Sequence, residues 1–245
     1  SAIPADRARL RNQGALLKEV RELLTLSRGY GMDSVRQRAM STAETVSASL
    51  SEVVDDSALE LVVDLRLAFG RLLAALGANE RAEKEHLDTA ELSLSQGWTE
   101  SACAALALAS HAAQARGDRA SSGRAWRQCR DAMESWPMNR PGERCGILVD
   151  AVGDPLVAVQ VLSARAEILV DGVEEDHSRA PIIREIISRA SEQASRCVSP
   201  PQGAVESLAR VEERVAPYGR GRGGRRRPGS TTTITTDGQA AAGGE

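Results

Sequence analysis

The histidines are the first candidates for chemistry in this chain. His86, His111 and His177 are scattered along the sequence, and only His86 has carboxylates close by, at Glu83 and Glu85. A histidine beside a carboxylate can act as a general acid or base. His86, Glu83 and Glu85 fit an amphipathic helix, however, and polar residues of such a helix ordinarily form its solvated face. No nucleophile stands at a useful spacing from them, so we expect no catalytic residues and no enzymatic activity.

Metal and cofactor sites are not expected either. The four cysteines, Cys103, Cys129, Cys145 and Cys197, form no CxxC pair, and short ligand spacing is what a zinc site needs. Cys103 and Cys129 fall within helical stretches, where a thiol usually behaves as a small buried hydrophobe. The acidic run 174–176 lacks the alternating ligands and the glycine of a calcium loop, so we expect a solvated linker.

An arginine-rich stretch around Trp126 is the best candidate for binding. Arg119, Arg124, Arg127 and Arg130 lie at helical spacing from it. One interpretation makes Trp126 an aromatic anchor in a cationic groove that holds an acidic peptide, with Arg119, Arg127 and Arg130 as the partner-binding cations. The other makes Trp126 a packing residue between helical hairpins, with solvated arginines around it. The sequence leaves both open.

The C-terminal tail carries the strongest charge asymmetry. The chain has a formal net charge of −3, but without the tail it has 26 basic and 32 acidic side chains. Flexible basic segments attract phosphate, so the tail is a candidate nucleic-acid contact, with a plain linker as the alternative. Residues 217–245 are poor in large apolar side chains, which predicts disorder. The basic side chains of the tail are five arginines: Arg220, Arg222, Arg225, Arg226 and Arg227.

The elements that would position these residues are all helical. Apolar residues make up 42% of the chain, mostly Ala, Leu and Val, and aromatic residues only 2%. Such composition suits closely packed helices rather than a β-sandwich. The spacing of apolar residues predicts ten helices, of which the third is apolar nearly all round and is the candidate central core helix. The ranges are 6–28, 33–50, 57–76, 79–96, 99–116, 118–135, 143–152, 154–171, 178–197 and 203–216.

Helix ends carry recognisable signals. Gly77 and Gly117 stand where a helix would end in a left-handed residue. Five helix starts have a candidate N-cap, and at one of them Pro155 occupies the first helical position. These caps are Asp33, Ser57 (in a capping box with Glu60), Asn79, Asp118 and Asp154.

The hairpins between residues 58 and 136 resemble tetratricopeptide repeats. The first unit is carried by Phe69-Gly70, Leu73, Gly77, Ala82 and His86, and the second by Gly117, Ser122, Trp126 and Cys129. Gly77 and Gly117 lie 40 residues apart, which is longer than the ~34-residue period of that family. The resemblance implies antiparallel hairpins stacked as a solenoid or right-handed superhelix, with a groove for a partner.

We therefore expect an all-α tetratricopeptide-like domain over 1–216 that binds a protein or peptide in a groove, as a scaffold or regulator in bacterial signalling. The alternative is a nucleic-acid-associated protein that uses the arginine tail. Uncapped array ends would also favour a homo-oligomer. Two lysines against many arginines are typical of a GC-rich, actinobacterial genome. Without an apolar run of ~20 residues or a signal peptide, we expect a cytoplasmic protein with no membrane contact.

Overall fold

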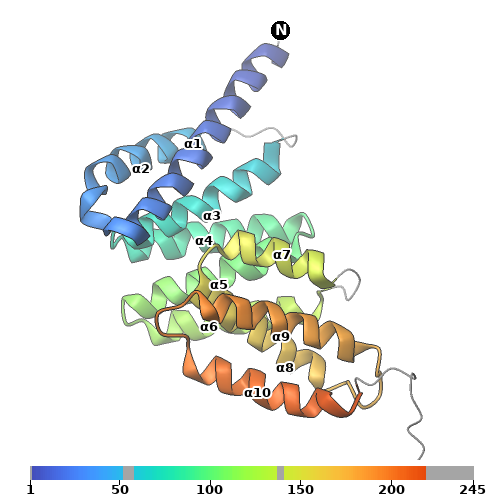
Figure 1. Cartoon of the computed structure of the whole chain (residues 1–245). Coiled ribbons are helices and arrows are strands. Elements are labelled where there is room, and N and C mark those ends of the chain that lie inside the picture. Colours follow the sequence, from blue (N-terminus) through green and yellow to red (C-terminus); the bar gives the residue numbers. More distant parts are fainter. Residues whose placement is uncertain (1, 52–57, 137–140, 219–245) are drawn as a thin grey trace, which may run out of the picture.

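The computed structural model describes residues 2–51, 58–136 and 141–218. Across these residues the chain is helical, without strands, and its helices pack as neighbouring pairs (Figure 1). All ten predicted helices are present, and their ends differ from the predicted ones by at most four residues. They are α1 (Ala2–Tyr30), α2 (Arg36–Leu50), α3 (Leu59–Ala75), α4 (Asn79–Ser95), α5 (Thr99–Ala115), α6 (Arg119–Glu134), α7 (Pro141–Val152), α8 (Pro155–Val170), α9 (Arg179–Ser195) and α10 (Gln202–Val215), with short 3-10 turns at Met32–Ser34 and Ala216–Tyr218.

Three glycine turns give the middle of the chain its regularity. Gly77, Gly97 and Gly117 all have φ between 73° and 84°, and they follow three helices of 17 residues each. At each turn the N–H groups of the glycine and of the next residue donate to carbonyls in the preceding helical turn, as in a Schellman motif. The turns predicted at Gly77 and Gly117 are confirmed. The equal steps of 20 residues lay α3 to α6 side by side, in alternating directions.

Two of the predicted N-caps are confirmed. The Asp118 side chain accepts a hydrogen bond from the Ser121 N–H at 2.9 Å. The Asp154 side chain accepts from the N–H groups of Leu156 and Val157 at 2.9 and 3.3 Å, with proline at the first helical position as expected. These caps fix where α6 and α8 begin, and both helices line the groove described below.

Two other predicted caps are wrong. Asp33 lies inside a 3-10 turn, where its carboxylate accepts from Arg36 Nε at 3.1 Å rather than from a helix N-terminus. Asn79 is already the first residue of α4, because the left-handed Gly77 sends the chain into the helix directly after Ala78. The capping box predicted at Ser57 lies outside the described residues.

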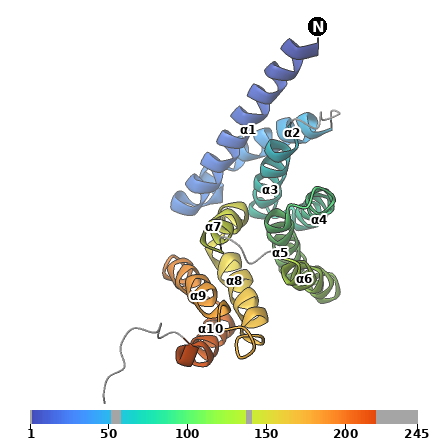
Figure 2. The same ribbon diagram turned by 90° about the vertical axis from the view of Figure 1, so that its right-hand side faces the viewer.

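The apolar core is divided into two clusters of buried residues. The smaller joins α1 and α2 to α3, and the larger extends from α3 through α10. The predicted core helix, α3, contributes to both. Within the larger cluster α5 packs against α4, α6 and α7, and α8 packs against α9 and α10 (Figure 2). Alanine predominates in the middle of α5, which lets neighbouring helices approach closely.

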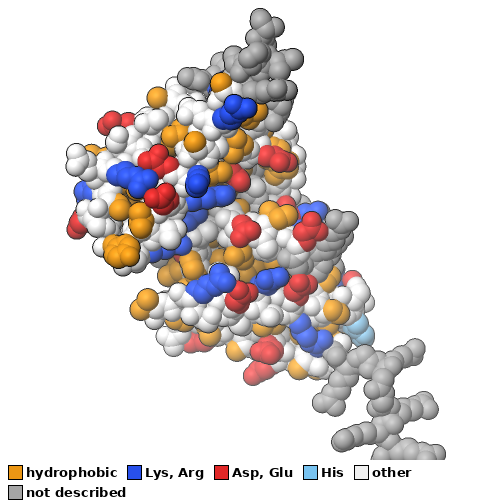
Figure 3. Space-filling view, turned by 45° about the horizontal axis from the view of Figure 1, so that its top comes forward, with side chains coloured by type: hydrophobic (Ala, Val, Ile, Leu, Met, Phe, Trp, Pro, Cys, Tyr) orange, Lys and Arg blue, Asp and Glu red, His pale blue; other side chains and the backbone are white. Residues whose placement is uncertain are grey.

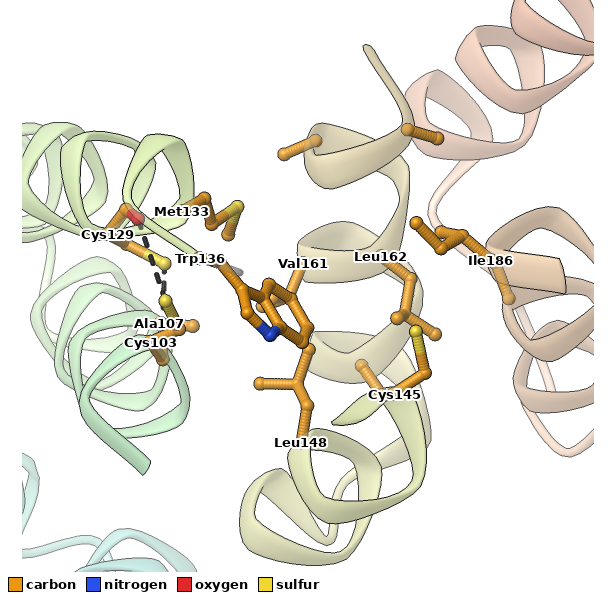
Figure 4. Packing of buried hydrophobic residues seen from close by; sticks show 14 of the residues in the cluster. Cys103, Ala107, Cys129, Met133, Trp136, Cys145, Leu148, Val161, Leu162 and Ile186 are labelled. Atoms are coloured by element: carbon orange, nitrogen blue, oxygen red, sulfur yellow. Dashed lines mark hydrogen bonds between the residues drawn. The ribbon is translucent and has the colours of Figure 1, made fainter. Parts of the chain in front are cut away.

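The cysteines are free, and Cys103, Cys129 and Cys145 are buried, as the sequence predicted for the first two. Cys103 and Cys129 face each other across the α5–α6 contact, and the Cys129 thiol approaches the Cys103 carbonyl oxygen at 3.4 Å (Figure 4). Burial raises the pKa of the Cys145 thiol to about 11. The three buried sulfurs fill space between helices, and burial lowers the reactivity of their thiols.

A buried arginine fixes α8 against the end of α6. Arg165 is 4% exposed and donates to the backbone carbonyl oxygens of Met133 and Trp136, the latter at 2.8 Å. Its guanidinium lies 5.3 Å from the Trp136 ring centroid, and the indole N–H donates to Glu100 at 3.0 Å. Burial lowers the pKa of Arg165. This network satisfies the last carbonyls of α6 and sets the position of the second half of the molecule.

A second contact that holds distant helices together lies at the turn between α7 and α8. The carbonyl oxygen of Gly153 accepts from Arg28 and from Arg71 at 2.5 and 2.8 Å. Burial, together with the neighbouring Arg28, lowers the pKa of Arg71 to about 10. Helices α1 and α3 are thereby tied to the start of α8.

The prediction that His86 lies on a solvated face is wrong. His86 is 1% exposed and Glu83 is 7% exposed, because α4 is covered by both α3 and α5. Burial lowers the pKa of His86 to about 3, so the imidazole is neutral at pH 7. Its ring lies against Gly70 of α3, where a methyl group would come within 2.7 Å of Nε2. A buried neutral ring against a glycine is a packing element.

Candidate partner-binding groove

A groove of about 590 Å³ lies between α6 on one side and α8 with α10 on the other. In Figure 2 the ribbons of α5 and α6 lie to the right of α8, and that of α10 lies below α8. We call this groove the α6–α10 groove. Its lining residues are Ser110, Gln114, Arg119, Ser122, Gly123, Trp126, Arg130, Gln160, Ser163, Ala164, Glu167, Gly203, Ala204 and Ser207.

Three of the four residues predicted for partner binding line this groove: Arg119, Trp126 and Arg130. Their spacing of seven and four residues puts them on one face of α6. Arg127, the fourth, is exposed and is not among the lining residues. Trp126 is half-buried and packs its inner side against the larger core cluster. Both interpretations of Trp126 therefore have a counterpart in the structure: its inner side packs and its outer side lines the groove.

The first turn of α6 is held in place by ion pairs and by its cap. Glu83 on α4 accepts from Arg116 Nε at 3.0 Å, and Arg116 also pairs with Asp118 at 3.3 Å. The hydrogen bonds from Ser121 lower the pKa of Asp118, so the cap is ionised at neutral pH. Arg119 follows directly after this fixed point, which sets the start of its side chain at one end of the groove.

Small residues make the groove floor. The hydroxyl of Ser110 on α5 lies 3.0 Å from both the carbonyl and the hydroxyl oxygen of Ser122 on α6. Across the groove, the hydroxyl of Ser163 on α8 donates to the Ala204 carbonyl of α10 at 3.1 Å. Gly123 adds no side chain. With so few large groups, a ligand backbone can approach the helices closely.

One carboxylate of the groove is already paired. Glu167 on α8 accepts from Arg130 on α6 at 3.4 Å and from the Ser207 hydroxyl on α10. This contact ties the three walls together and neutralises the acid among the lining residues. The side chains of Arg130 and Glu167 are 42% and 38% exposed, so the pair remains open to a ligand.

Potential metal ligands do not gather in the described part of the chain. No group of three or more potential metal ligands occurs there. In the acidic run 174–176, Asp176 accepts from the Ser178 N–H at 3.0 Å and pairs with Arg179, so it helps to start α9.

None of the helices in the described ranges has the length and hydrophobicity of a membrane span. The arginine tail lies outside the described residues.

Sequence reasoning missed the far wall of the groove. Gln160, Glu167, Gly203 and Ser207 carry no motif, and they stand 41 to 88 positions beyond Arg119 along the chain. Only the packing of α8 and α10 beside α6 brings these four residues to the groove.

Comparison with protein-family models, with curated proteins and with solved structures finds no match to this chain.

Proposed function

We propose that this chain is a non-enzymatic protein-interaction module, built as a tetratricopeptide-like array of helical hairpins, that binds a segment of a partner protein in the α6–α10 groove. The observation that carries the proposal is the shared position of Arg119, Trp126 and Arg130. Two cations and a half-buried aromatic ring, on one helix face and along one groove, are the kind of residues that dominate binding energy at protein interfaces.

A second pocket, of about 630 Å³, is lined by four acidic side chains and one arginine and holds none of the residues predicted for partner binding. On the face shown in Figure 3, acidic and basic side chains are interspersed rather than gathered by sign. The volume of the α6–α10 groove is within the range of pockets that bury a ligand, about 300–1,000 Å³. A scaffold or regulatory role follows from such a module, with specificity set by the groove.

The experiment is a selection from a random peptide library on the full chain, followed by affinity measurements on three variants. Arg119→Glu reverses a charge in the groove, and Trp126→Ala removes the ring. Arg124→Glu is the matched control, because Arg124 is exposed on the same helix, donates to Ser121 at 2.7 Å and is not among the residues that line the groove. We expect at least a tenfold loss for each groove variant, about 1.4 kcal/mol, and less than twofold for the control. Selected peptides that bind all four proteins equally would overturn the proposal.

A second candidate function rests on the tail. Its five arginines have no acid among them over 220–227, and the residues before the tail are acidic in sum. In this case the full chain would bind nucleic acid with a log–log salt slope of up to about −4.5, because each neutralised phosphate contributes about −0.9. A chain ending at residue 218 would lose that binding and keep any peptide binding in the groove.

A further inference from the structure

Among the described residues, the α6–α10 groove contains one unpaired arginine and one arginine that is paired with a single carboxylate. Within the described residues the guanidinium of Arg119 makes neither an ion pair nor a hydrogen bond, although Arg119 lines the groove. Arg130 is paired with Glu167, but that carboxylate also accepts from Ser207, so the arginine keeps donors for a ligand. An arginine guanidinium has five N–H donors, and one carboxylate does not use them all.

The N-terminus of α10 adds to the positive potential. Gly203 and Ala204, in its first turn, line the groove, and the turn contains no acidic residue. The cap position is occupied by Pro201, and no side chain caps the helix. Free N–H groups and the helix dipole at such an end favour a negative charge. Around Gly203 the space is open, since a methyl group built there meets nothing within 4 Å.

The volume of the groove, about 590 Å³, limits the length of an extended segment that it can hold. An extended residue fills about 160 Å³, taking 3.3 Å along the strand and spacings of 4.8 and 10 Å across it. The groove therefore holds about four extended residues.

Polar side chains suited to an extended backbone are present. The amides of Gln114 and Gln160 line the groove and make no hydrogen bond within the described residues. An extended segment leaves its own N–H and C=O groups unpaired, whereas a helix satisfies them internally. The outer side of Trp126 is then available for one apolar side chain.

We infer that the α6–α10 groove binds an extended acidic segment of about four residues, with carboxylates at Arg119 and at the N-terminus of α10 and an apolar side chain on Trp126. This inference rests on the proposed function and adds the chemistry of the ligand. The carboxylates meet the unpaired donors, the two glutamines bond the backbone, and the small floor residues admit it.

The test uses fluorescently labelled five-residue peptides and the full chain, with binding measured by anisotropy at 50 and 300 mM salt. The acidic probe is DDLDD, and KKLKK and NNLNN are its charge-reversed and uncharged counterparts. A fourth peptide, DDLPD, keeps most of the charge and excludes a helix, because proline and the residue before it disfavour that conformation. We expect DDLDD to bind at least tenfold more tightly than NNLNN at low salt, and DDLPD to bind within threefold of DDLDD.

The variants locate the site. Arg119→Glu should weaken DDLDD at least tenfold, and Arg124→Glu less than twofold. Gly203→Asp, which puts a carboxylate at the open end of α10, should also weaken it severalfold. Circular dichroism of each variant checks that the helices remain.

The outcomes separate this inference from the proposed function. If DDLDD binds no better than NNLNN, or loses nothing in Arg119→Glu, the acidic ligand is refuted. The proposed function survives that result if library peptides of other chemistry still depend on Trp126. If DDLPD fails while DDLDD binds, the extended conformation is refuted. If neither the probes nor the library peptides depend on the groove, both proposals fail.

Discussion

Replacement of Gly70 by alanine tests the packing of α3 against α4. Gly70 lies inside α3, and a Cβ built on it falls 2.7 Å from Nε2 and 2.8 Å from Nδ1 of His86. Carbon atoms do not approach ring nitrogens so closely, and the ring is 1% exposed. Either the imidazole or the helix must therefore shift.

The magnitude follows from two opposing effects. A helix-interior Gly→Ala change stabilises a helix by about 1 kcal/mol where nothing is in contact. An extra methyl group in a packed core costs about 1–3 kcal/mol. Since the contact at Gly70 is shorter than real Cβ contacts, we take the upper half of that range. We expect a net destabilisation of about 1–2 kcal/mol, or about 2–8 °C in melting temperature at this chain length.

Gly146→Ala is the matched control. Gly146 lies within α7, and a Cβ there meets nothing within 4 Å, so this variant should gain up to about 1 kcal/mol. Urea unfolding of the full chain, followed by circular dichroism, measures both. In a His86→Ala background, Gly70→Ala should lose its penalty, because the methyl group then enters the space that the ring vacated. A Gly70→Ala protein as stable as the Gly146→Ala protein would refute the reasoning.

The remaining predictions concern buried groups. Because the pKa of His86 is about 3 in the folded state and about 6.5 in the unfolded state, its contribution is complete above pH 6.5 and is lost as the pH falls toward 3. The free energy of unfolding should therefore drop by about 2 kcal/mol between pH 6.5 and 5, and this drop should be absent in His86→Gln; equal slopes in urea titrations would contradict it. Arg165→Met leaves the Trp136 carbonyl without its donor, while the Met133 carbonyl keeps the Trp136 N–H, and should cost about 1–3 kcal/mol; a loss below 1 kcal/mol would show that α8 does not depend on this contact. With a thiol reagent at pH 8, the half-buried Cys197 should react first and the three other cysteines only on unfolding; prompt reaction of all four thiols in the native protein would be inconsistent with their burial.

Local sequence determined the helices because their signals act over a few residues. Apolar spacing and glycine turns placed all ten, and the caps at Asp118 and Asp154 were readable because a short side chain reaches only the next N–H groups. Asp33 and Asn79 were misread because the turn before them, not the residue type, decides which residue enters the helix first.

Only the α6 side of the candidate site could be predicted from the sequence. The face of α6 with Arg119, Trp126 and Arg130 follows from helical periodicity alone. The burial of His86 did not follow, since one amphipathic pattern cannot show that a second helix covers the other side. Glu167 and Ser207 carried no signal in the sequence at all.

The sequence by itself determined the helices, their order and the charged face of α6, because these depend on neighbours within about two turns. The tertiary structure decided that α8 and α10 stand beside that face and close the groove. Their position depends on contacts between residues far apart in the chain, such as Arg165 with the end of α6 and Arg130 with Glu167. Such contacts leave no periodic pattern in the sequence, because a single ion pair or carbonyl contact can be made by many residue types at many separations.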